Sequence, residues 1–285
     1  MSPTAVAPSI HPALAEGNVA VVTGGANGIG LATAEKLLRG GLQVCVADFD
    51  DEALESAAEQ LDGAGEVLVH KTDVSDAASV DALANAVTDQ LGPVSVLMNN
   101  AGVGGGGDAI SNLEGWQRVL GVNLFGVIHG VQRFVPDMVA SDRPGLVINT
   151  GSKQGITQPP GDTAYNVSKS GIKSLTEGLA HTLLQQTEGR VTAHLLVPGF
   201  TFTGMIKRFI KEKPPGAWLP AQVADFLFES LDRGDFYVLC PDDDVTREMD
   251  EKRALWNTMD LIENRPALSR WNPAFEAEFE AFMKK

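Results

Sequence analysis

Short apolar runs rich in β-branched residues alternate with longer segments of helical spacing from Val19 onward. The runs that we predict as strands are residues 19–23, 44–48, 66–70, 94–99, 146–151 and 191–198. Because these runs are apolar throughout and separated by helical segments, they predict a parallel sheet with helices on both faces and connections of one hand. The pattern therefore predicts a single-domain α/β fold, a Rossmann-type doubly wound parallel β-sheet.

The two ends of the chain have different patterns. Residues 1–17 carry three prolines among small residues, which predicts a mobile or loosely packed tail. Residues 18–240 form the predicted Rossmann domain, whose last elements are a helix at 220–232 and a seventh strand at 236–240. Residues 241–285 predict a helical C-terminal extension with two amphipathic sets. Those sets are Met249, Leu255, Trp256, Met259 and Ile262, followed by Trp271, Phe275, Phe279 and Phe282.

The amino-acid composition limits the kinds of partner that we expect the chain to bind. The chain has 285 residues, 44% of them apolar, which is ample for a packed core. Its formal charge of -15 argues against nucleic acid, since phosphate binding relies on clustered Lys and Arg. No run approaches the roughly 18 apolar residues of a membrane span, and residues 1–17 have no Lys or Arg to begin a signal peptide. We therefore expect a cytoplasmic protein with no membrane partner.

We expect no metal site and no disulfide. Cys45 lies in an apolar run and Cys240 precedes a proline, which suits reduced thiols. The acidic run 242–244 could suggest a divalent cation, but no further oxygen ligands follow at a loop spacing, so a solvated charge run is favoured. The histidines show no ligand spacing; they are His11, His70, His129, His181 and His194.

A glycine-rich turn lies between the first strand and a helix that runs to about Arg39. It contains Gly24, Asn27, Gly28, Ile29 and Gly30. Glycines here let the backbone approach a pyrophosphate, whose charge meets the positive end of the helix. The spacing Gly-x-x-x-Gly-x-Gly departs from the commoner Gly-x-Gly-x-x-Gly fingerprint. A plain tight turn is the alternative, and the position between strand and helix favours a dinucleotide site.

Asp48 ends the second strand, 18 residues past Gly30. A carboxylate there can accept hydrogen bonds from ribose hydroxyls and would repel a 2′-phosphate. Asn27, Phe49 and Asp50 offer no cation to hold that phosphate. These residues favour NAD over NADP. The alternative is that Asp48 is an N-cap or turn residue before the helix that begins near residue 51.

Ser152, Tyr165 and Lys169 are set 13 and 4 residues apart. A helical spacing of four places the phenol and the ammonium on one face, where the cation favours the phenolate and lowers a pKa that starts near ~10. Tyr165 then becomes a proton donor or acceptor near neutral pH. Tyr165 as a half-buried aromatic and Lys169 as a solvated charge is the alternative, and the preceding strand, Ser152 and the glycine turn favour the chemical interpretation.

On these residues the chain resembles the short-chain dehydrogenase/reductase family, over roughly residues 17–203. Further positions match the family pattern in order: Asp73 and Val74, then Asn99, Asn100, Ala101 and Gly102, then Asn123, then Pro198 and Gly199. After Gly199 the family has an aliphatic residue and then a Thr. This chain has Thr201 at the aliphatic position and keeps Thr203.

The resemblance implies roles for these residues. Asp73 and Val74 would contact the adenine, and Asn100, Ala101 and Gly102 would shape the floor of the cofactor cleft. Pro198, Gly199, Thr201 and Thr203 would border the nicotinamide, with Thr203 the firmer candidate for its carboxamide. Tyr165 and Lys169 would also contact the cofactor, with Lys169 on the nicotinamide ribose, while Asn123 would link Lys169 to solvent through a water.

Together these inferences predict an NAD-dependent alcohol dehydrogenase or carbonyl reductase, which transfers a hydride between the nicotinamide and a secondary alcohol or ketone. Tyr165 would be the general acid/base, and Ser152 would polarise the substrate oxygen. Enoyl reduction is disfavoured by the Tyr-to-Lys gap of four, and epimerase or dehydratase chemistry by the glycine spacing. A catalytically silent dinucleotide-binding regulator or scaffold of the same fold remains the alternative.

Three segments are expected to border the substrate: residues 103–108, 153–162 and a lid at about 200–220. Pro214, Pro215 and Gly216 would interrupt a helix in the lid, as in a closing loop. The lid's apolar side chains favour an apolar or aromatic alcohol, unless they only pack the domain edge. They are Phe200, Phe202, Met205, Ile206, Phe209, Ile210 and Trp218.

The end of the chain departs from the family, whose members finish soon after a last strand closed by a glycine pair. Here Cys240 and Pro241 follow, and the chain continues to Lys285. The extension could dock on a partner subunit or enlarge the core, which we rank equally, and covering its own substrate cleft ranks third. A homodimer or homotetramer is expected, although the extension puts the usual tetramer geometry in doubt. Substrate identity, stereospecificity and physiological direction stay open.

Overall fold

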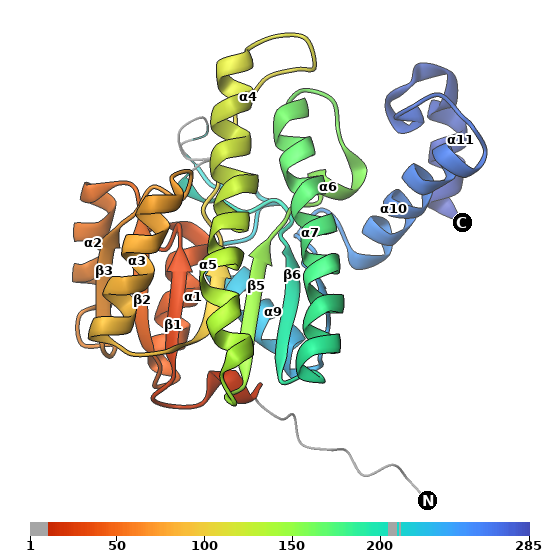
Figure 1. The fold of residues 1–285 in the computed structure, drawn as a ribbon. Coiled ribbons are helices and arrows are strands. Elements are labelled where there is room, and N and C mark those ends of the chain that lie inside the picture. Colours follow the sequence, from red (N-terminus) through yellow and green to blue (C-terminus); the bar gives the residue numbers. More distant parts are fainter. Residues whose placement is uncertain (1–10, 205–209, 211) are drawn as a thin grey trace, which may run out of the picture.

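One parallel sheet of seven strands organises the chain (Figure 1). The structure is a computed structural model that describes residues 11–204, 210 and 212–285. The strands are β1 (Val19–Thr23), β2 (Gln43–Asp48), β3 (Val67–Lys71), β4 (Val94–Asn99), β5 (Gly145–Thr150), β6 (Val191–Val197) and β7 (Tyr237–Leu239). They lie in the order β3-β2-β1-β4-β5-β6-β7, and every neighbouring pair is parallel. The strand order reverses between β1 and β4, so the carboxyl ends of these strands form a crevice where such folds bind ligands.

Helices cover both faces of the sheet, as the apolar strands predict. One face packs against α1 (Gly28–Arg39), α2 (Asp51–Leu61) and α9 (Pro220–Asp232). The other packs against α3 (Ala77–Gln90), α5 (Gly126–Ala140) and α7 (Thr163–Thr187). Each face holds its own cluster of buried apolar side chains, because the central strands β1, β2, β4, β5 and β6 are buried on both sides. The doubly wound α/β fold is confirmed.

The predicted strands and the structure agree to within about a residue. β1 and β4 have the predicted bounds, and α9 spans residues 220–232 as expected. The sequence pattern did not separate α5 from the helix before it. That helix, α4 (Leu113–Leu120), continues into α5 through a π-helical turn, Gly121–Phe125. Such turns occur often at functional sites, and this one carries Asn123.

The N-terminal segment is only partly described. Residues 1–10 lie outside the described residues, so the predicted tail is not addressed there. Residues Pro12–Leu14 form a 3-10 turn in which Ala13 and Leu14 are buried, and Leu14 joins the core on one sheet face. The loosely packed tail therefore does not extend to residue 17, because the side chains of Ala13 and Leu14 are buried in the core.

The C-terminal extension forms a small helical lobe beside α6 (Gln154–Thr157) and α7, drawn in dark blue in Figure 1. It comprises α10 (Arg247–Ile262), 3-10 turns at Ser269–Trp271 and Pro273–Phe275, and α11 (Glu276–Lys284). Trp256 is 3% exposed, and its ring centre lies 5.3 and 5.2 Å from the ring centres of Phe279 and Phe282. Its Nε1 donates to Ser269 Oγ at 2.8 Å. The extension thus has a small core of its own.

Within the described part of the chain, no helix combines the length and apolar character that crossing a membrane requires.

Candidate active site

Ser152, Tyr165 and Lys169 meet at the carboxyl end of β5. Ser152 follows that strand by two residues, and the other two lie in the first turns of α7. The Ser152 side chain lies close enough to the Tyr165 phenol to favour a lower pKa for it. The Lys169 Nζ atom lies 5.6 Å from the centre of the Tyr165 ring and donates to the Thr150 carbonyl oxygen at 2.8 Å. The spacing in the sequence therefore does bring the three side chains together.

The pKa values of this cluster depart from the sequence-based expectation. Burial raises the pKa of Tyr165; the Ser152 hydroxyl opposes that rise and the Asp162 carboxylate adds to it. Burial also lowers the pKa of Lys169 to about 8. A lowered Tyr165 pKa is thus wrong for the protein alone, because desolvation dominates and the ammonium is directed at the Thr150 carbonyl.

Asn123 is fully buried and uses all of its polar atoms. Its Oδ1 accepts from Val103 N at 2.8 Å, and its Nδ2 donates to Val103 O and Ser168 Oγ at 2.9 and 3.1 Å. A Cβ added to Gly102 would lie 3.6 Å from Asn123 Oδ1 and 3.7 Å from Lys169 Nζ. Asn123 and Lys169 therefore border the same backbone, with Asn123 fixing the chain at Val103.

Asp162 ends the segment 153–162 that was expected to border the substrate, and its contacts were not predicted from the sequence. It caps α7 by accepting from Tyr165 N at 3.1 Å, and its other oxygen accepts from Gly105 N and Gly106 N at 2.7 and 3.2 Å. It thereby joins the glycine-rich segment 103–108 to the start of α7. The signal was available: an Asp three residues before Tyr165 at a helix start is a typical N-cap.

The glycine turn is packed too tightly for side chains. A Cβ on Gly24, whose φ is +59°, would lie 2.6 Å from Ala101 Cα, and one on Gly30 would lie 2.2 Å from the Gly24 carbonyl oxygen. Asn100 Nδ2 donates to that same oxygen at 3.0 Å. The turn is thus locked against the segment after β4 by backbone contacts.

The start of α1 differs from the starts of its neighbours. At α2 and α3 the N-cap side chains of Asp50 and Asp76 accept backbone hydrogen bonds, whereas within the described chain the α1 N-cap, Asn27, makes no side-chain capping bond. The first N–H groups of a helix need an acceptor. An anion can supply it, so this terminus suits a phosphate group.

Asp48 lies beside the glycine turn. Its Oδ2 accepts from Ala26 N at 3.1 Å and its Oδ1 from Phe49 N at 2.8 Å. The N-cap of α2 is Asp50, whose carboxylate accepts from Ala53 N. The N-cap interpretation of Asp48 is therefore wrong, whereas the turn interpretation holds for Oδ1, which also accepts from Asp50 N at 3.4 Å. The other oxygen, Oδ2, faces the glycine turn.

The remaining predicted residues line the same edge of the sheet. Asp73 Oδ1 accepts from Ser75 N at 2.9 Å just beyond β3, next to the buried Val74. Thr203 lies against the glycine turn, since a Cβ on Gly28 would be 3.2 Å from its methyl group.

Thr201 is placed differently from Thr203. Its hydroxyl donates to the Gly199 carbonyl at 3.1 Å, and its backbone pairs with Trp218. Ile29 is a buried residue of the first turn of α1, and Pro198 immediately follows β6.

The segment after Gly199 is only partly exposed. Phe200 is 39% exposed, while Phe202 is buried and Trp218 packs edge-on against Phe226 at 5.9 Å. Domain-edge packing therefore accounts for Phe202 and Trp218, and Phe200 remains available to a ligand. Met205, Ile206 and Phe209, which also carried the lid prediction, lie outside the described residues.

The acidic run 242–244 is a solvated charge run only in part, because Asp243 and Asp244 are exposed and Asp242 is not. Asp242 is buried and accepts from Phe200 N and Val245 N at 3.1 and 2.8 Å, and its Oδ2 lies 3.2 Å from Lys153 Nζ. Asp243 accepts from the Trp218 indole at 3.1 Å. The sequence did not show this, because the partners Lys153, Phe200 and Trp218 lie in distant segments.

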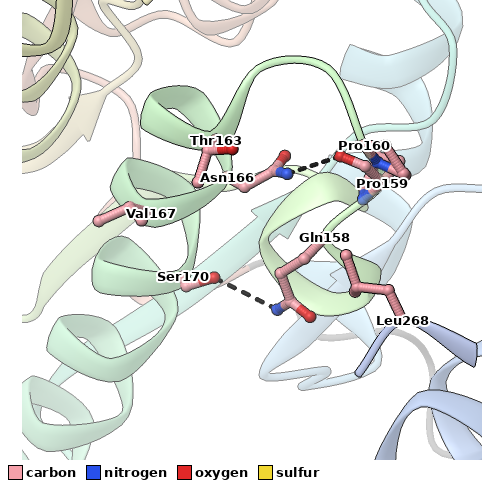
Figure 2. Close-up of a pocket in the computed structure, with 8 residues that line it drawn as sticks. All are labelled: Gln158, Pro159, Pro160, Thr163, Asn166, Val167, Ser170 and Leu268. Atoms are coloured by element: carbon pink, nitrogen blue, oxygen red, sulfur yellow. Dashed lines mark hydrogen bonds between the residues drawn. The ribbon is translucent and has the colours of Figure 1, made fainter. Parts of the chain in front are cut away.

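A separate cavity of about 250 Å³ lies on the outer side of α7 (Figure 2). Its lining residues are Gln158, Pro159, Pro160, Thr163, Asn166, Val167, Ser170 and Leu268. The α7 residues in this set lie about 100° or more around the helix from Tyr165. The cavity is therefore distinct from the catalytic cluster, and the extension contributes to it through Leu268.

Comparison with known proteins agrees with this geometry. A family model described as short chain dehydrogenase matches residues 18–214. The 1-deoxy-11-beta-hydroxypentalenate dehydrogenase of Streptomyces exfoliatus is 32% identical over 259 residues, 88% of this chain and 93% of that protein. A galactitol 2-dehydrogenase of Rhizobium johnstonii is 38% identical over 169 residues, 58% of this chain and 65% of that protein, just under two thirds of its length.

Solved structures show the same fold. A short chain dehydrogenase/reductase from Burkholderia phymatum, crystallised in complex with NAD, superposes with a TM-score of 0.79 at 34% identity. The match covers 88% of this chain and 96% of that chain.

Proposed function

The chain belongs to the short-chain dehydrogenase/reductase family of oxidoreductases, and on this basis we propose that it is an NAD-dependent dehydrogenase of secondary alcohols, or in reverse a reductase of ketones. The observation that carries the proposal is the meeting of Ser152, Tyr165 and Lys169, with the Lys169 ammonium 5.6 Å from the centre of the phenol ring and Ser152 near enough to act on its pKa. These groups supply what proton exchange at a hydroxyl-bearing carbon requires.

The residues at the glycine turn fit a dinucleotide. Gly24, Gly28 and Gly30 pack the turn closely against its neighbours, and the uncapped start of α1 suits a pyrophosphate. Asn100, Ala101 and Gly102 would form the floor beneath it, with Asp73 and Val74 at the adenine end and Pro198, Gly199, Thr201 and Thr203 at the nicotinamide end. When bound, the nicotinamide supplies the hydride donor or acceptor.

The preference for NAD over NADP rests on Asp48. Its carboxylate faces the turn, where it would accept hydrogen bonds from ribose hydroxyls and repel a 2′-phosphate. The NAD complex of the Burkholderia relative supports the same preference.

The chain's own side chains would handle the substrate proton. Ser152 would hold the substrate oxygen, and Tyr165 would take the hydroxyl proton of an alcohol or return it to a ketone. Lys169 would stabilise the phenolate and hold the nicotinamide ribose, with Asn123 connecting Lys169 to solvent through a water. Because burial raises the pKa of Tyr165 in the protein alone, any lowering of that pKa depends on turning the Lys169 ammonium from Thr150 toward the phenol.

The substrate we propose is an apolar or aromatic alcohol. The exposed ring of Phe200 supports this, next to Gly199 at the same edge of the sheet. One relative is named for galactitol and another for a hydroxypentalenate, so the substrate class has to rest on this chain's own residues. We also propose a homodimer or homotetramer and a cytoplasmic location.

A direct assay tests the proposal. Wild-type protein is incubated with NAD⁺ or NADP⁺ and with matched aryl and polar secondary alcohols, and formation of the reduced nicotinamide is followed by absorbance. We expect NAD-dependent turnover with a preference for the aryl series. Equal efficiency on both series would remove the apolar-substrate proposal, and tight NAD binding without turnover on any alcohol would favour the regulator or scaffold.

A further inference from the structure

Helix α6 lies between Ser152 and Lys169, two of the proposed catalytic residues. Gly155 N donates to the Ser152 carbonyl at 2.9 Å, and Gln154 N donates to Ser152 Oγ at 3.2 Å. On its other side α6 touches α7, since a Cβ on Gly155 would lie 2.6 Å from the carbonyl carbon of Lys169. A shift of α6 would therefore disturb Ser152 and Lys169 together.

Lys153 is the residue before α6, and its ammonium pairs with two buried carboxylates. Its Nζ lies 3.2 Å from Asp242 Oδ2 and 2.7 Å from Asp250 Oδ2, and the three side chains are 18%, 4% and 7% exposed. Asp242 Oδ2 also accepts from Phe200 N at 3.1 Å. The carboxylate passes directly over Gly199, where a Cβ would be 2.6 Å away. One cation thus joins the segment after Ser152, the segment after Gly199 and α10.

The far end of α6 is held by the same helix of the extension. Asn257 Nδ2 donates to the Ile156 carbonyl and to Gln158 Oε1, both at 3.1 Å. Asp250 and Asn257 are seven residues apart, two turns of one helix face, about 10 Å along the axis. Gln158 in turn donates to Ser170 Oγ on α7 at 3.4 Å (Figure 2). Helix α10 therefore lies along α6 and holds both of its ends.

Buried carboxylates require a cation, because an unpaired charge in a poorly solvated site is costly. Burial raises the pKa of Asp250, and the Lys153 ammonium opposes that rise. Without Lys153 the two carboxylates would repel each other and draw in water. The segments that they hold would then separate.

We propose that Lys153 is a positioning residue and that, through it, the C-terminal extension sets the arrangement of Ser152 and of the loop after Gly199 on the substrate side of the site. The inference builds on the proposed dehydrogenase function. It assigns the extension to the shape of the chain's own active site, whereas the glycine turn has no part in this network.

The test compares Lys153→Met with Lys153→Arg, which keeps the charge, and with Lys252→Met. Lys252 lies on α10, pairs with Glu248 at 2.7 Å and donates to the Met283 carbonyl at 3.2 Å, so its contacts stay inside the extension. Full-length variants are measured for kcat and KM with the best alcohol, for NAD dissociation constant, and for amide hydrogen exchange in residues 154–158 and 199–202.

For Lys153→Met we expect kcat/KM to fall about tenfold or more, mainly through kcat, with the NAD dissociation constant unchanged. Exchange should quicken in both segments. Lys153→Arg should restore most of the activity, and Lys252→Met should behave as wild type. If Lys153→Met matches Lys252→Met in turnover and in exchange, the inference is wrong. If wild type itself shows no turnover, the proposed function fails, and the exchange measurement alone decides the inference.

A milder pair of variants covers the case in which Lys153→Met does not fold. Asn257→Ala removes the second hold on α6, and Thr258→Ala changes the neighbouring residue, whose hydroxyl bonds only within α10. Exchange in residues 156–158 should quicken for Asn257→Ala and stay unchanged for Thr258→Ala. Equal exchange in the two variants would overturn the inference.

Discussion

The glycine turn and the C-terminal extension reach the same edge of the sheet by different physical means. The turn is built from backbone packed on backbone, with Gly30 against the Gly24 carbonyl and Gly24 against Ala101. The extension is joined through side-chain charge, with Lys153 between Asp242 and Asp250. The contacts of the turn are made by main-chain atoms, whether the partners are 6 positions apart, as for Gly24 and Gly30, or 77 apart, as for Gly24 and Ala101. The charged contacts of Lys153 reach Asp242 and Asp250, 89 and 97 positions away.

This difference separates two tasks. The glycine turn, which we call the cofactor half of the site, should be rigid and intolerant of any added atom, because a backbone cannot move aside for a Cβ. The segments that Lys153 joins to the extension, which we call the substrate half, should tolerate changes in shape but not in charge. Changes in one half should therefore leave the other half's ligand largely unaffected.

The largest effect we expect comes from Trp256→Ala, which empties the small core of the extension. Large-to-small changes at buried aromatic residues cost about 3–5 kcal/mol, and Trp256 packs on two Phe rings. Thermal unfolding should show early loss of the extension, while the NAD dissociation constant stays within about twofold of wild type. The control is Leu261→Ala on the same helix, where the side chain is 85% exposed. Loss of NAD binding in step with loss of the extension would break the separation.

The next effect tests the backbone-built half. Gly30→Ala places a methyl group 2.2 Å from the Gly24 carbonyl oxygen, which should cost about 1–3 kcal/mol and abolish NAD binding in a fluorescence titration of the cofactor. Gly178→Ala is the matched control, because nothing lies within 4 Å of its added Cβ. In the middle of α7 it should stabilise the protein by about 0.5–1 kcal/mol. Normal NAD affinity in Gly30→Ala would contradict the account.

The same contrast explains what the sequence could predict. The strands and the meeting of Ser152 with Tyr165 and Lys169 follow from local periodicity and from positions near strand ends, which the chain encodes over a few residues. The Asp242 and Lys153 pairing does not, because a charge reads as solvated until its distant partner is known. The prediction of a lowered Tyr165 pKa was wrong for a related reason. The spacing placed Lys169 nearby, but burial and the Thr150 carbonyl decide where the charge of Lys169 acts.

A smaller effect should come from Asp48→Asn, which keeps the shape of the side chain and removes its charge. The preference for NAD over NADP, measured as a ratio of kcat/KM values, should fall about tenfold, or about 1.4 kcal/mol, because repulsion of a 2′-phosphate is lost. Asp50→Asn controls for charge, since Asn is also a good N-cap and Asp50 caps α2. An unchanged ratio for Asp48→Asn would remove Asp48 as the selecting residue.

The smallest effect lies outside both halves. Burial beside His194 lowers the pKa of His11 from 6.5 to about 4, so the folded state holds a neutral ring. Unfolding then takes up protons between these values, and stability, full above pH 6.5, should fall as pH drops toward 4. His11→Gln should flatten that slope by up to about one proton in denaturant titrations. A slope equal to wild type would show that other groups carry the acid sensitivity.

The central claim is that Tyr165 exchanges the substrate proton. Its most direct test is Tyr165→Phe, assayed for NAD binding and for turnover of the best alcohol in the same preparation. We expect the dissociation constant to stay within about twofold of wild type and turnover to fall by about 10²–10⁴. Wild-type turnover by folded, NAD-bound Tyr165→Phe would contradict the proposed chemistry.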